Sequence, residues 1–191
     1  MHVPDNRQRL LQVALTCFAS RGYDATGVQE IATDAGVTKP TLYHYFGSKV
    51  GLLDTLVRET TRDYLDAFDA ACRFEGDLTY TLSRIVAVTL EFAKRRPDVY
   101  RFLLMLRFLP QEHEARRTAA PVLDRQMEAL TTMFLKAAQK HGNMAGRHQR
   151  YAVTFYGHLI ACAVPVMDGA LVDDDRLRHD IVHQFSYGIY S

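Results

Sequence analysis

The sequence predicts an all-α protein, and three observations support this fold class. Apolar residues recur at the three- and four-residue spacing of helices through most of the 191 residues. Alternating apolar and polar runs bounded by turns, which are typical of strands, are essentially absent. Glycine and proline fall between the periodic stretches, where helices end. A hydrophobic content of 48% supplies enough apolar side chains for a buried core and excludes global disorder.

The first helix is expected over about residues 6–20. Leu10, Ala14 and Phe18 share one apolar stripe within it. Gly22 is placed to end this helix in a left-handed conformation. The segment therefore predicts an amphipathic helix that packs on a small core.

Two more short helices are expected next. Thr26 and Gln29 have the spacing of a capping box, so they are expected to open the second helix. That helix ends by Gly36, and Thr38 opens the third. Gly47-Ser48 then ends the third helix and caps a fourth.

Longer helices are expected in the rest of the chain. They are predicted over residues 49–74, 78–95, 98–108, 111–140, 147–168 and 175–189, with separators at Gly76, Pro97, Pro110, His141-Gly142 and Gly169. The change from short to long helices predicts two domains, residues 1–48 and residues 49–191. The expected architecture is an N-terminal three-helix domain followed by a larger helical bundle.

Charge and cysteine content restrict the function classes. Lys and Arg number 23 against 22 Asp and Glu, so any nucleic-acid footprint must be local rather than a broadly basic surface. The chain shows no signal peptide and no run of the ~18–20 apolar residues that a membrane span needs, which predicts a cytoplasmic protein. The three cysteines are far apart, without a CxxC pair, so no disulfide framework, metal or cofactor is expected.

Residues 28–46 have the spacing of a helix-turn-helix. Ala32 is small where two helices must approach each other, and Gly36 stands where the turn requires a positive φ. Leu42 and Tyr45 are expected to give the second helix of the motif its inward side. An ordinary helical hairpin is the alternative interpretation, because alanine and glycine are common residues.

The third helix has two different faces. Its apolar face comprises Leu42, Tyr45 and Phe46, and its solvent-facing side comprises Lys39, Pro40, Tyr43 and His44. Lysine neutralises phosphate, and a tyrosine hydroxyl can donate to a phosphate oxygen. With Thr38 as N-cap, the N-terminus of this helix is available to an anion. The exposed side therefore predicts a contact with a DNA backbone and groove edge.

The segment from Gly36 to Lys49, GVTKPTLYHYFGSK, resembles the recognition segment of the TetR family of transcriptional regulators. The preceding residues Ala14, Phe18, Gly22, Tyr23, Thr26, Ile31, Ala32 and Ala35 are similar to the rest of that family's DNA-binding domain. Family members often carry Glu-Ala where this chain has Val50-Gly51. This departure puts the rigidity of the fourth helix's start in doubt, because glycine costs ~1 kcal/mol of helix propensity relative to alanine.

The resemblance implies a set of DNA contacts. Thr26 and Gly27 match positions near the phosphate backbone, and Lys49 matches a phosphate-binding lysine. The helix that enters the major groove matches Thr38, Lys39, Pro40, Thr41, Tyr43 and His44. For His44, contact with a base edge, contact with a phosphate and a spacer role all remain open. Tyr43 could instead pack half-buried, and Lys49 could be a solvated lysine of the first helical turn.

The resemblance also implies a homodimer on a palindromic operator, formed by the last two long helices. The residues expected at that interface are Tyr151, Phe155, Leu159, Cys162, Val166, Ile181, Phe185 and Ile189. The alternative is that these faces close the core of the monomer.

A small, largely apolar effector is a further implication of the resemblance. Candidate pocket residues are Phe68, Tyr100, Leu103, Met105, Leu106, Met127, Leu130, Phe134, Phe155 and His158. The alternative is that this set of aromatic residues and methionines forms the core, with His158 as a hydrogen-bonded structural histidine. The hypothesis is a regulator, by default a repressor, that releases its operator when the effector binds.

An enzyme is not expected, because the sequence has no Gly-rich phosphate loop, metal-spaced cluster or nucleophile elbow. His113, Glu114 and residues 173–175 are interpreted as solvated helix ends and a polar loop. The alternative function is a helical small-molecule-binding or interaction protein that has lost operator binding. The presence of Lys39, Tyr43 and Lys49 together argues against that alternative.

Overall fold

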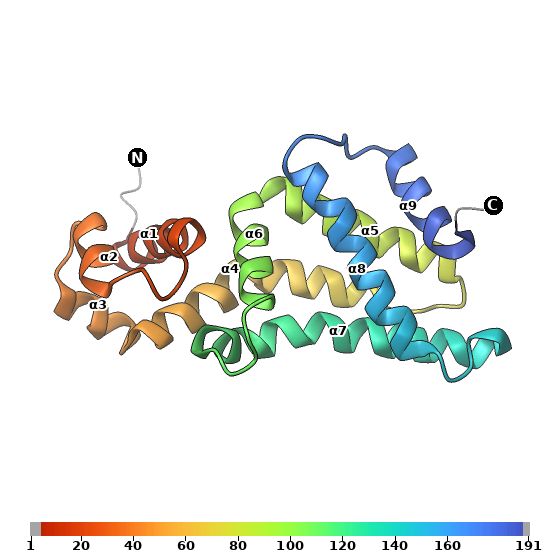
Figure 1. Ribbon diagram of the computed structural model, residues 1–191, viewed down its shortest axis with the longest axis horizontal. Helices are drawn as coiled ribbons and strands as arrows, with labels where there is room; N and C mark the ends of the chain where they lie inside the picture. The colour runs from red at the N-terminus through yellow and green to blue at the C-terminus, as the bar shows by residue number, and fades with distance from the viewer. Residues whose placement is uncertain (1–4, 189–191) are drawn as a thin grey trace. The chain divides into compact units, whose positions relative to one another are not determined.

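The computed structural model describes residues 5–188, and that part of the chain contains helices and no strand (Figure 1). The helices are α1 (Asn6–Arg21), α2 (Val28–Asp34), α3 (Lys39–Phe46), α4 (Lys49–Ala71), α5 (Leu78–Arg95), α6 (Pro97–Arg107), α7 (Glu114–Lys140), the 3-10 turn η1 (Gly142–Met144), α8 (His148–Met167) and α9 (Asp175–Tyr187). The predicted all-α class is confirmed. None of these helices is long and apolar enough to cross a membrane.

The starts of α2 and α7 differ from the predictions. The predicted capping box at the start of α2 is wrong, because the N-cap is Gly27 and no side chain caps it. Helix α7 begins at Glu114, later than predicted. At this end the His113 carbonyl accepts from the Arg117 N–H, and His113 Nδ1 accepts from the Ala115 N–H. The first bond is the first one of the helical ladder, and the second satisfies a donor that a helix start otherwise leaves open.

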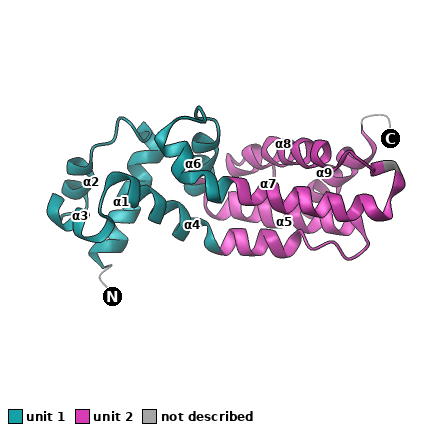
Figure 2. Ribbon diagram, turned by 90° about the horizontal axis from the view of Figure 1, so that it is seen from below, with its two compact units in different colours: residues 1–62, 98–123 teal, residues 63–97, 124–191 magenta. Residues whose placement is uncertain are grey.

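The chain forms two compact units (Figure 2). The first unit comprises residues 1–62 and 98–123, and the second comprises residues 63–97 and 124–191. Helices α4 and α7 contribute to both, since a unit boundary falls inside each of them. The domain boundary expected after residue 48 stays a prediction, and the compact units group α6 and the start of α7 with the three short helices.

The core of the first unit is built on the apolar stripe of α1. Leu10, Ala14 and Phe18 are fully buried, as the period predicted. The Phe18 ring stacks on Phe102 of α6 with 6.0 Å between centroids, and the centroid of the Tyr23 ring lies 5.4 Å from that of Phe18. Each large apolar side chain buried in this way contributes roughly 1.5–3 kcal/mol. The same core therefore holds α6 and the three short helices together.

The second unit has an aromatic core that contains one buried polar pair. Phe134 and Phe155 are fully buried, and the Phe185 ring lies 4.8 Å from that of Phe155. Tyr64 stacks on Phe92 at 4.1 Å, and its hydroxyl accepts a 2.8 Å hydrogen bond from Gln126 Nε2. Because a buried amide without a partner costs about 1–3 kcal/mol, this bond fixes the register of α4 against α7 within the unit.

Candidate DNA-binding interface

The turn between α2 and α3 has the geometry that the sequence predicted. Gly36 has a φ of +68°, a left-handed conformation in which other residues are strained. A Cβ at this position would also lie 2.9 Å from Nη2 of Arg9. The Val37 N–H donates to the Ala32 carbonyl at 2.9 Å and closes the turn. Helices α2 and α3 thus form a helix-turn-helix.

Helix α3 begins and packs as expected. Thr38 is its N-cap, and the Thr38 hydroxyl oxygen accepts from the Thr41 N–H at 3.4 Å. Pro40 occupies the first turn, where it removes no intrahelical hydrogen bond. Leu42 and Phe46 are buried and hold the helix on the first unit.

The opposite side of α3 presents a cation and three aromatic rings to solvent. Lys39, Tyr43 and His44 are exposed, and Lys39 Nζ lies 5.6 Å from the centroid of the Tyr43 ring. Tyr45 is also 37% exposed, so the prediction of an inward Tyr45 is wrong. With 100° of rotation per residue, the Tyr45 side chain leaves α3 about 80° away from the direction midway between the buried Leu42 and Phe46. Its ring lies 5.6 Å from that of His44, which makes Tyr45 a contact candidate that sequence reasoning missed.

The structure does not present the Thr26 side chain to solvent. Thr26 is 1% exposed, and its hydroxyl donates to the Gly22 carbonyl at 2.8 Å. This bond holds the loop between α1 and α2. Of the predicted pair, Gly27 is the residue that is open to solvent at the start of α2.

The structure at the start of α4 explains why this chain has glycine at position 51, where members of the TetR family often carry alanine. The Ser48 Oγ accepts from the Gly51 N–H at 3.0 Å, so Ser48 caps the helix as predicted. A Cβ at residue 51 would lie only 2.1 Å from the backbone oxygen of Phe46. Glycine therefore permits a close approach of α3 and α4 at their corner, and an alanine there would separate them.

Lys49 is half-buried, unlike a fully solvated lysine of a first helical turn. Its Nζ lies 4.2 Å from the centroid of the Tyr23 ring. Burial lowers the pKa of Lys49, and the nearby Asp24 and Glu114 carboxylates oppose this shift. Lys49 follows Phe46, the last residue of α3, by three positions, so its ammonium belongs to the segment directly after the recognition helix.

Ion pairs within the first unit reduce the positive charge available to DNA. Arg21 pairs with Glu30 at 2.9 Å, and Arg7 pairs with Glu59. Lys39 is the exposed cation of α3 itself. Attraction to phosphate must therefore come from a few placed charges.

The residues expected at a dimer interface divide by burial. Phe155, Leu159, Val166 and Ile181 are buried inside the second unit, Tyr151, Cys162 and Phe185 are half-buried, and Ile189 lies outside the described residues. The buried members contribute to the core of the single chain, which is the alternative that the sequence left open. The outward side of α8 instead carries Val153, Gly157, Ile160, Ala161 and Val164, of which Val153 is 61% exposed. This second apolar stripe has the same period and lies about half a turn away.

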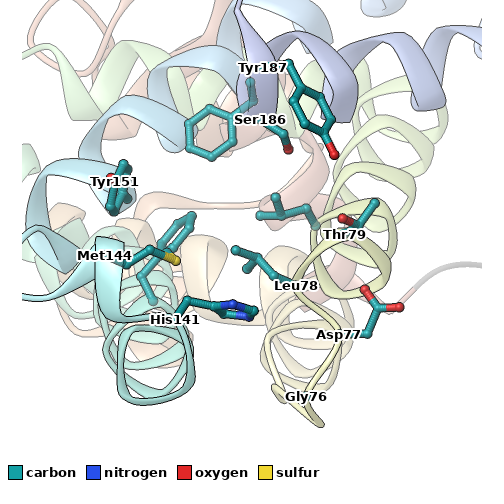
Figure 3. Close-up of a pocket in the computed structure, with 12 residues that line it drawn as sticks. Gly76, Asp77, Leu78, Thr79, His141, Met144, Tyr151, Ser186 and Tyr187 are labelled. Atoms are coloured by element: carbon teal, nitrogen blue, oxygen red, sulfur yellow. The ribbon is translucent and has the colours of Figure 1, made fainter.

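The second unit contains a cavity of 530 Å³. Its lining combines apolar and polar side chains, namely Leu78, Leu82, Phe134, Met144, Tyr151 and Phe185 with Asp77, Thr79, His141, Ser186 and Tyr187, beside Gly76. Figure 3 shows Tyr151 and Met144 facing Leu78 and Thr79 across the space. The volume falls within the roughly 300–1,000 Å³ of ligand pockets.

The predicted pocket residues are distributed over both units. Phe134 lines the 530 Å³ cavity, and Met105 and Leu106 line a smaller one of 210 Å³ in the first unit. Phe68, Tyr100, Leu103, Leu130 and Phe155 are buried, and Met127 is half-buried. His158 Nε2 lies 3.0 Å from the Ile181 carbonyl, to which it donates. This bond gives His158 the structural role that was the alternative.

The turn, the capped α3 and its exposed cationic and aromatic side define a helix-turn-helix protein of the DNA-binding class. Residues 10–56 match the family described as bacterial regulatory proteins, tetR family. The match places a DNA-binding domain of the TetR family over these residues.

Two transcriptional regulators are similar to parts of the chain, and one solved structure is similar to its fold. The chain is 48% identical over 60 residues to the transcriptional repressor KstR2 of Mycolicibacterium smegmatis, and 32% identical over 99 residues to the transcriptional activator FasR of the same species. These matches cover 31% and 52% of this chain but 27% and 45% of the relatives, so the chain spans less than half the length of either. The regulator FadR of Bacillus subtilis in complex with stearoyl-CoA is similar with a TM-score of 0.75 and 19% identity, over 95% of this chain and 98% of FadR. At that identity the likeness to FadR concerns the fold.

Proposed function

We propose that the chain is a sequence-specific DNA-binding transcriptional regulator, by default a repressor, that acts in the cytoplasm as a homodimer on a palindromic operator. The observation that carries this proposal is the exposed side of α3, where Lys39 and Tyr43 stand together on a helix held by buried Leu42 and Phe46. A rigid helix with a cation and a phenol on its open side suits phosphate and groove-edge contacts. KstR2 is named a repressor and FasR an activator, so the direction of regulation needs its own assay.

A salt titration tests the DNA contact directly. Duplexes selected from a random library supply the target, and fluorescence anisotropy measures the Kd over a range of salt concentrations. Lys49→Ala should weaken binding to all sequences and lower the salt slope by about 1, because one phosphate contact is lost. Lys94→Ala, on an exposed lysine of α5, is the matched control and should leave the slope unchanged. An unchanged slope in Lys49→Ala would remove this lysine from the contact set.

The dimer is proposed to use the outward stripe of α8 together with α9. Val153, Gly157 and Ala161 recur at a four-residue spacing on exposed positions, and small side chains let two helices approach each other closely. A second copy of the same stripe would cover it in a two-fold symmetric contact. This arrangement would present two α3 helices to two half-sites.

Sedimentation analysis tests this interface. The purified protein should sediment as a dimer at micromolar concentration, and Val153→Glu should shift it to the monomer, because a charge cannot be buried there without a partner. Gln139→Glu, at an exposed position of α7, is the control and should leave the dimer intact. A wild-type monomer would contradict the palindromic site.

The effector is proposed to be a small, largely apolar molecule that weakens operator binding. The 530 Å³ cavity of the second unit supports room for such a ligand. A long acyl chain is the first apolar group to test, with stearoyl-CoA as the probe, because FadR of Bacillus subtilis has been solved with stearoyl-CoA. The effector can shift operator binding only by its differential affinity for the free and the DNA-bound states.

Release of a labelled operator in the presence of stearoyl-CoA tests the effector proposal. Thr79→Trp should abolish the response by filling the cavity, whereas Gln139→Trp, outside the lining, should retain it. A response that survives Thr79→Trp would place the ligand elsewhere. Binding of the ligand by a protein that selects no DNA would favour the alternative of a helical small-molecule-binding protein.

A further inference from the structure

The Lys49 ammonium lies in a cage of three side chains from two other segments of the first unit, Tyr23 and Asp24 of the loop between α1 and α2 and Glu114 of α7. Its Nζ is 4.2 Å from the centroid of the Tyr23 ring, which is itself buried at 6% exposure. The Tyr23 hydroxyl donates a 2.8 Å hydrogen bond to Oε2 of Glu114, in the first turn of α7. Glu114 therefore fixes the ring on which the ammonium rests.

A second contact ties the same loop to the same helix end. Asp24, next to Tyr23 in the chain, lies with its Oδ2 2.9 Å from Nε2 of His113. The other nitrogen of that ring, Nδ1, accepts from the Ala115 N–H at 3.1 Å. Neutral His113 therefore carries its proton on Nε2 and donates it to Asp24. The start of α7 is thus bound to the loop at two points.

The side chains around Lys49 attract its positively charged form. Burial lowers the pKa of Lys49, whereas Asp24 and Glu114 act in the opposite direction by attracting the charged form. Burial and Glu114 raise the pKa of Tyr23, so the phenol stays protonated and keeps its hydrogen bond. The ring face adds a cation–π attraction to the ammonium.

We propose that Tyr23, Asp24 and Glu114 form an internal binding site for the Lys49 ammonium that competes with DNA phosphate. The proposal rests on the proposed function, in which Lys49 binds phosphate. Glu114 then sets the affinity for DNA without touching the DNA. A charge on α7 thereby acts on a residue at the start of α4.

The expected change of DNA affinity depends on how far solvent screens the attraction between Glu114 and Lys49. A carboxylate and an ammonium near the surface attract each other only weakly, because solvent screens them. Removing the Glu114 charge should therefore tighten DNA binding by about three- to fivefold. Glutamine keeps an amide oxygen that can accept from the Tyr23 hydroxyl, so Glu114→Gln removes the charge with little change of shape.

The test is a double-mutant cycle on the DNA affinity of the full chain. Glu114→Gln is measured in the wild-type background and in Lys49→Met, which retains an aliphatic stem over the ring but no charge. Glu112→Gln, two residues earlier and exposed, is the matched control for a general loss of negative charge. Fluorescence anisotropy at fixed salt gives the Kd of each variant for the selected duplex.

We expect Glu114→Gln to lower the Kd for the duplex about three- to fivefold when Lys49 is present. In the Lys49→Met background, Glu114→Gln should leave the Kd unchanged. Glu112→Gln should stay within about twofold of the wild type. The proposal is overturned if the two glutamine variants shift the Kd alike, or if the Glu114→Gln effect persists in Lys49→Met. Either result would assign the change to general electrostatics.

A measurement without DNA keeps this test separate from the proposed function. Reductive ¹³C-methylation labels the lysines, and the Lys49 signal is the one missing from Lys49→Met. Glu114→Gln should move the titration of Lys49 to lower pH, because a carboxylate that favours its charged form is gone. Glu112→Gln should leave it in place. A Lys49 titration unmoved by Glu114→Gln overturns the cage, whereas a wild-type protein that selects no duplex overturns the proposed function.

Discussion

Gly51→Ala is a change for which helix propensity and the structure predict opposite signs. In an ordinary helix interior, alanine is more stable than glycine by about 1 kcal/mol. In this chain the new Cβ would lie 2.1 Å from the backbone oxygen of Phe46, the last residue of α3. We therefore expect Gly51→Ala to destabilise the first unit.

The magnitude follows from the distance that must be gained. Ordinary contact begins at 3.4 Å, so the Cβ and the Phe46 oxygen would have to separate by about 1.3 Å. A carbonyl oxygen cannot rotate away as a flexible side chain does, so α3 and α4 must move apart. Overpacking of this kind costs about 1–3 kcal/mol, occasionally more, and exceeds the gain in propensity. A net loss of about 2 kcal/mol would lower the Tm by about 4–8 °C.

Urea denaturation of Gly51→Ala and Gly157→Ala provides the comparison. Gly157 lies within α8 with open space around its Cβ position in the single chain, so in the Val153→Glu background, which lacks the proposed α8 contact, its alanine variant should be stabilised by about 1 kcal/mol. Curves at two protein concentrations separate unfolding from subunit dissociation. Gly51→Ala should also bind DNA more weakly while still folded, because the α3–α4 corner opens. If it were instead stabilised as much as Gly157→Ala, the close approach at Phe46 would be refuted.

Tyr64→Phe should destabilise the second unit by about 1–3 kcal/mol, because Gln126 would lose its buried acceptor; an unchanged urea midpoint would contradict this. Burial raises the pKa of Cys72 to about 12, so in the folded protein at pH 8 its thiol should not react with Ellman's reagent. The Cys72 thiol should react once urea unfolds the chain. Rapid labelling of Cys72 in the native protein, located by mass spectrometry, would contradict this prediction. His44→Asn should change which bases a random duplex library enriches, since His44 is exposed on α3, and an unchanged consensus would exclude it from base recognition.

The features that the sequence predicted correctly are local ones. The stripe of α1, the positive φ of Gly36 and the Thr38 cap each depend on residues within one or two helical turns. Period and turn chemistry determine such features before tertiary packing is considered. The recognition helix could therefore be placed from the sequence, together with the exposure of Lys39 and Tyr43.

Features that depend on tertiary contacts could not be predicted. Glu114 was interpreted as a solvated helix end, yet it accepts a hydrogen bond from Tyr23, 91 residues away. Thr26 has a capping spacing, but packing buries its hydroxyl against the loop. Tyr45 lies at the flank of the buried side, where the period alone does not decide exposure.

Helix α8 shows a further limit. Helix α8 is apolar on both sides, so the helical period of its apolar residues does not show which side is buried. Phe155 and Leu159 face the core, and the smaller side chains of Gly157 and Ala161 face outward. Side-chain size is the signal in the sequence that could have separated the two sides, because large apolar residues fill a core better than small ones.

Selection of bound duplexes from a random library by the 191-residue chain tests sequence-specific DNA binding most directly. We expect enrichment of an inverted repeat with two half-sites, to which a dimer binds with an affinity that falls as salt is added. Loss of that enrichment is expected for Lys39→Ala with Tyr43→Phe, which removes the exposed cation and phenol of α3. A library that yields no enriched sequence with the wild-type protein would contradict sequence-specific DNA binding.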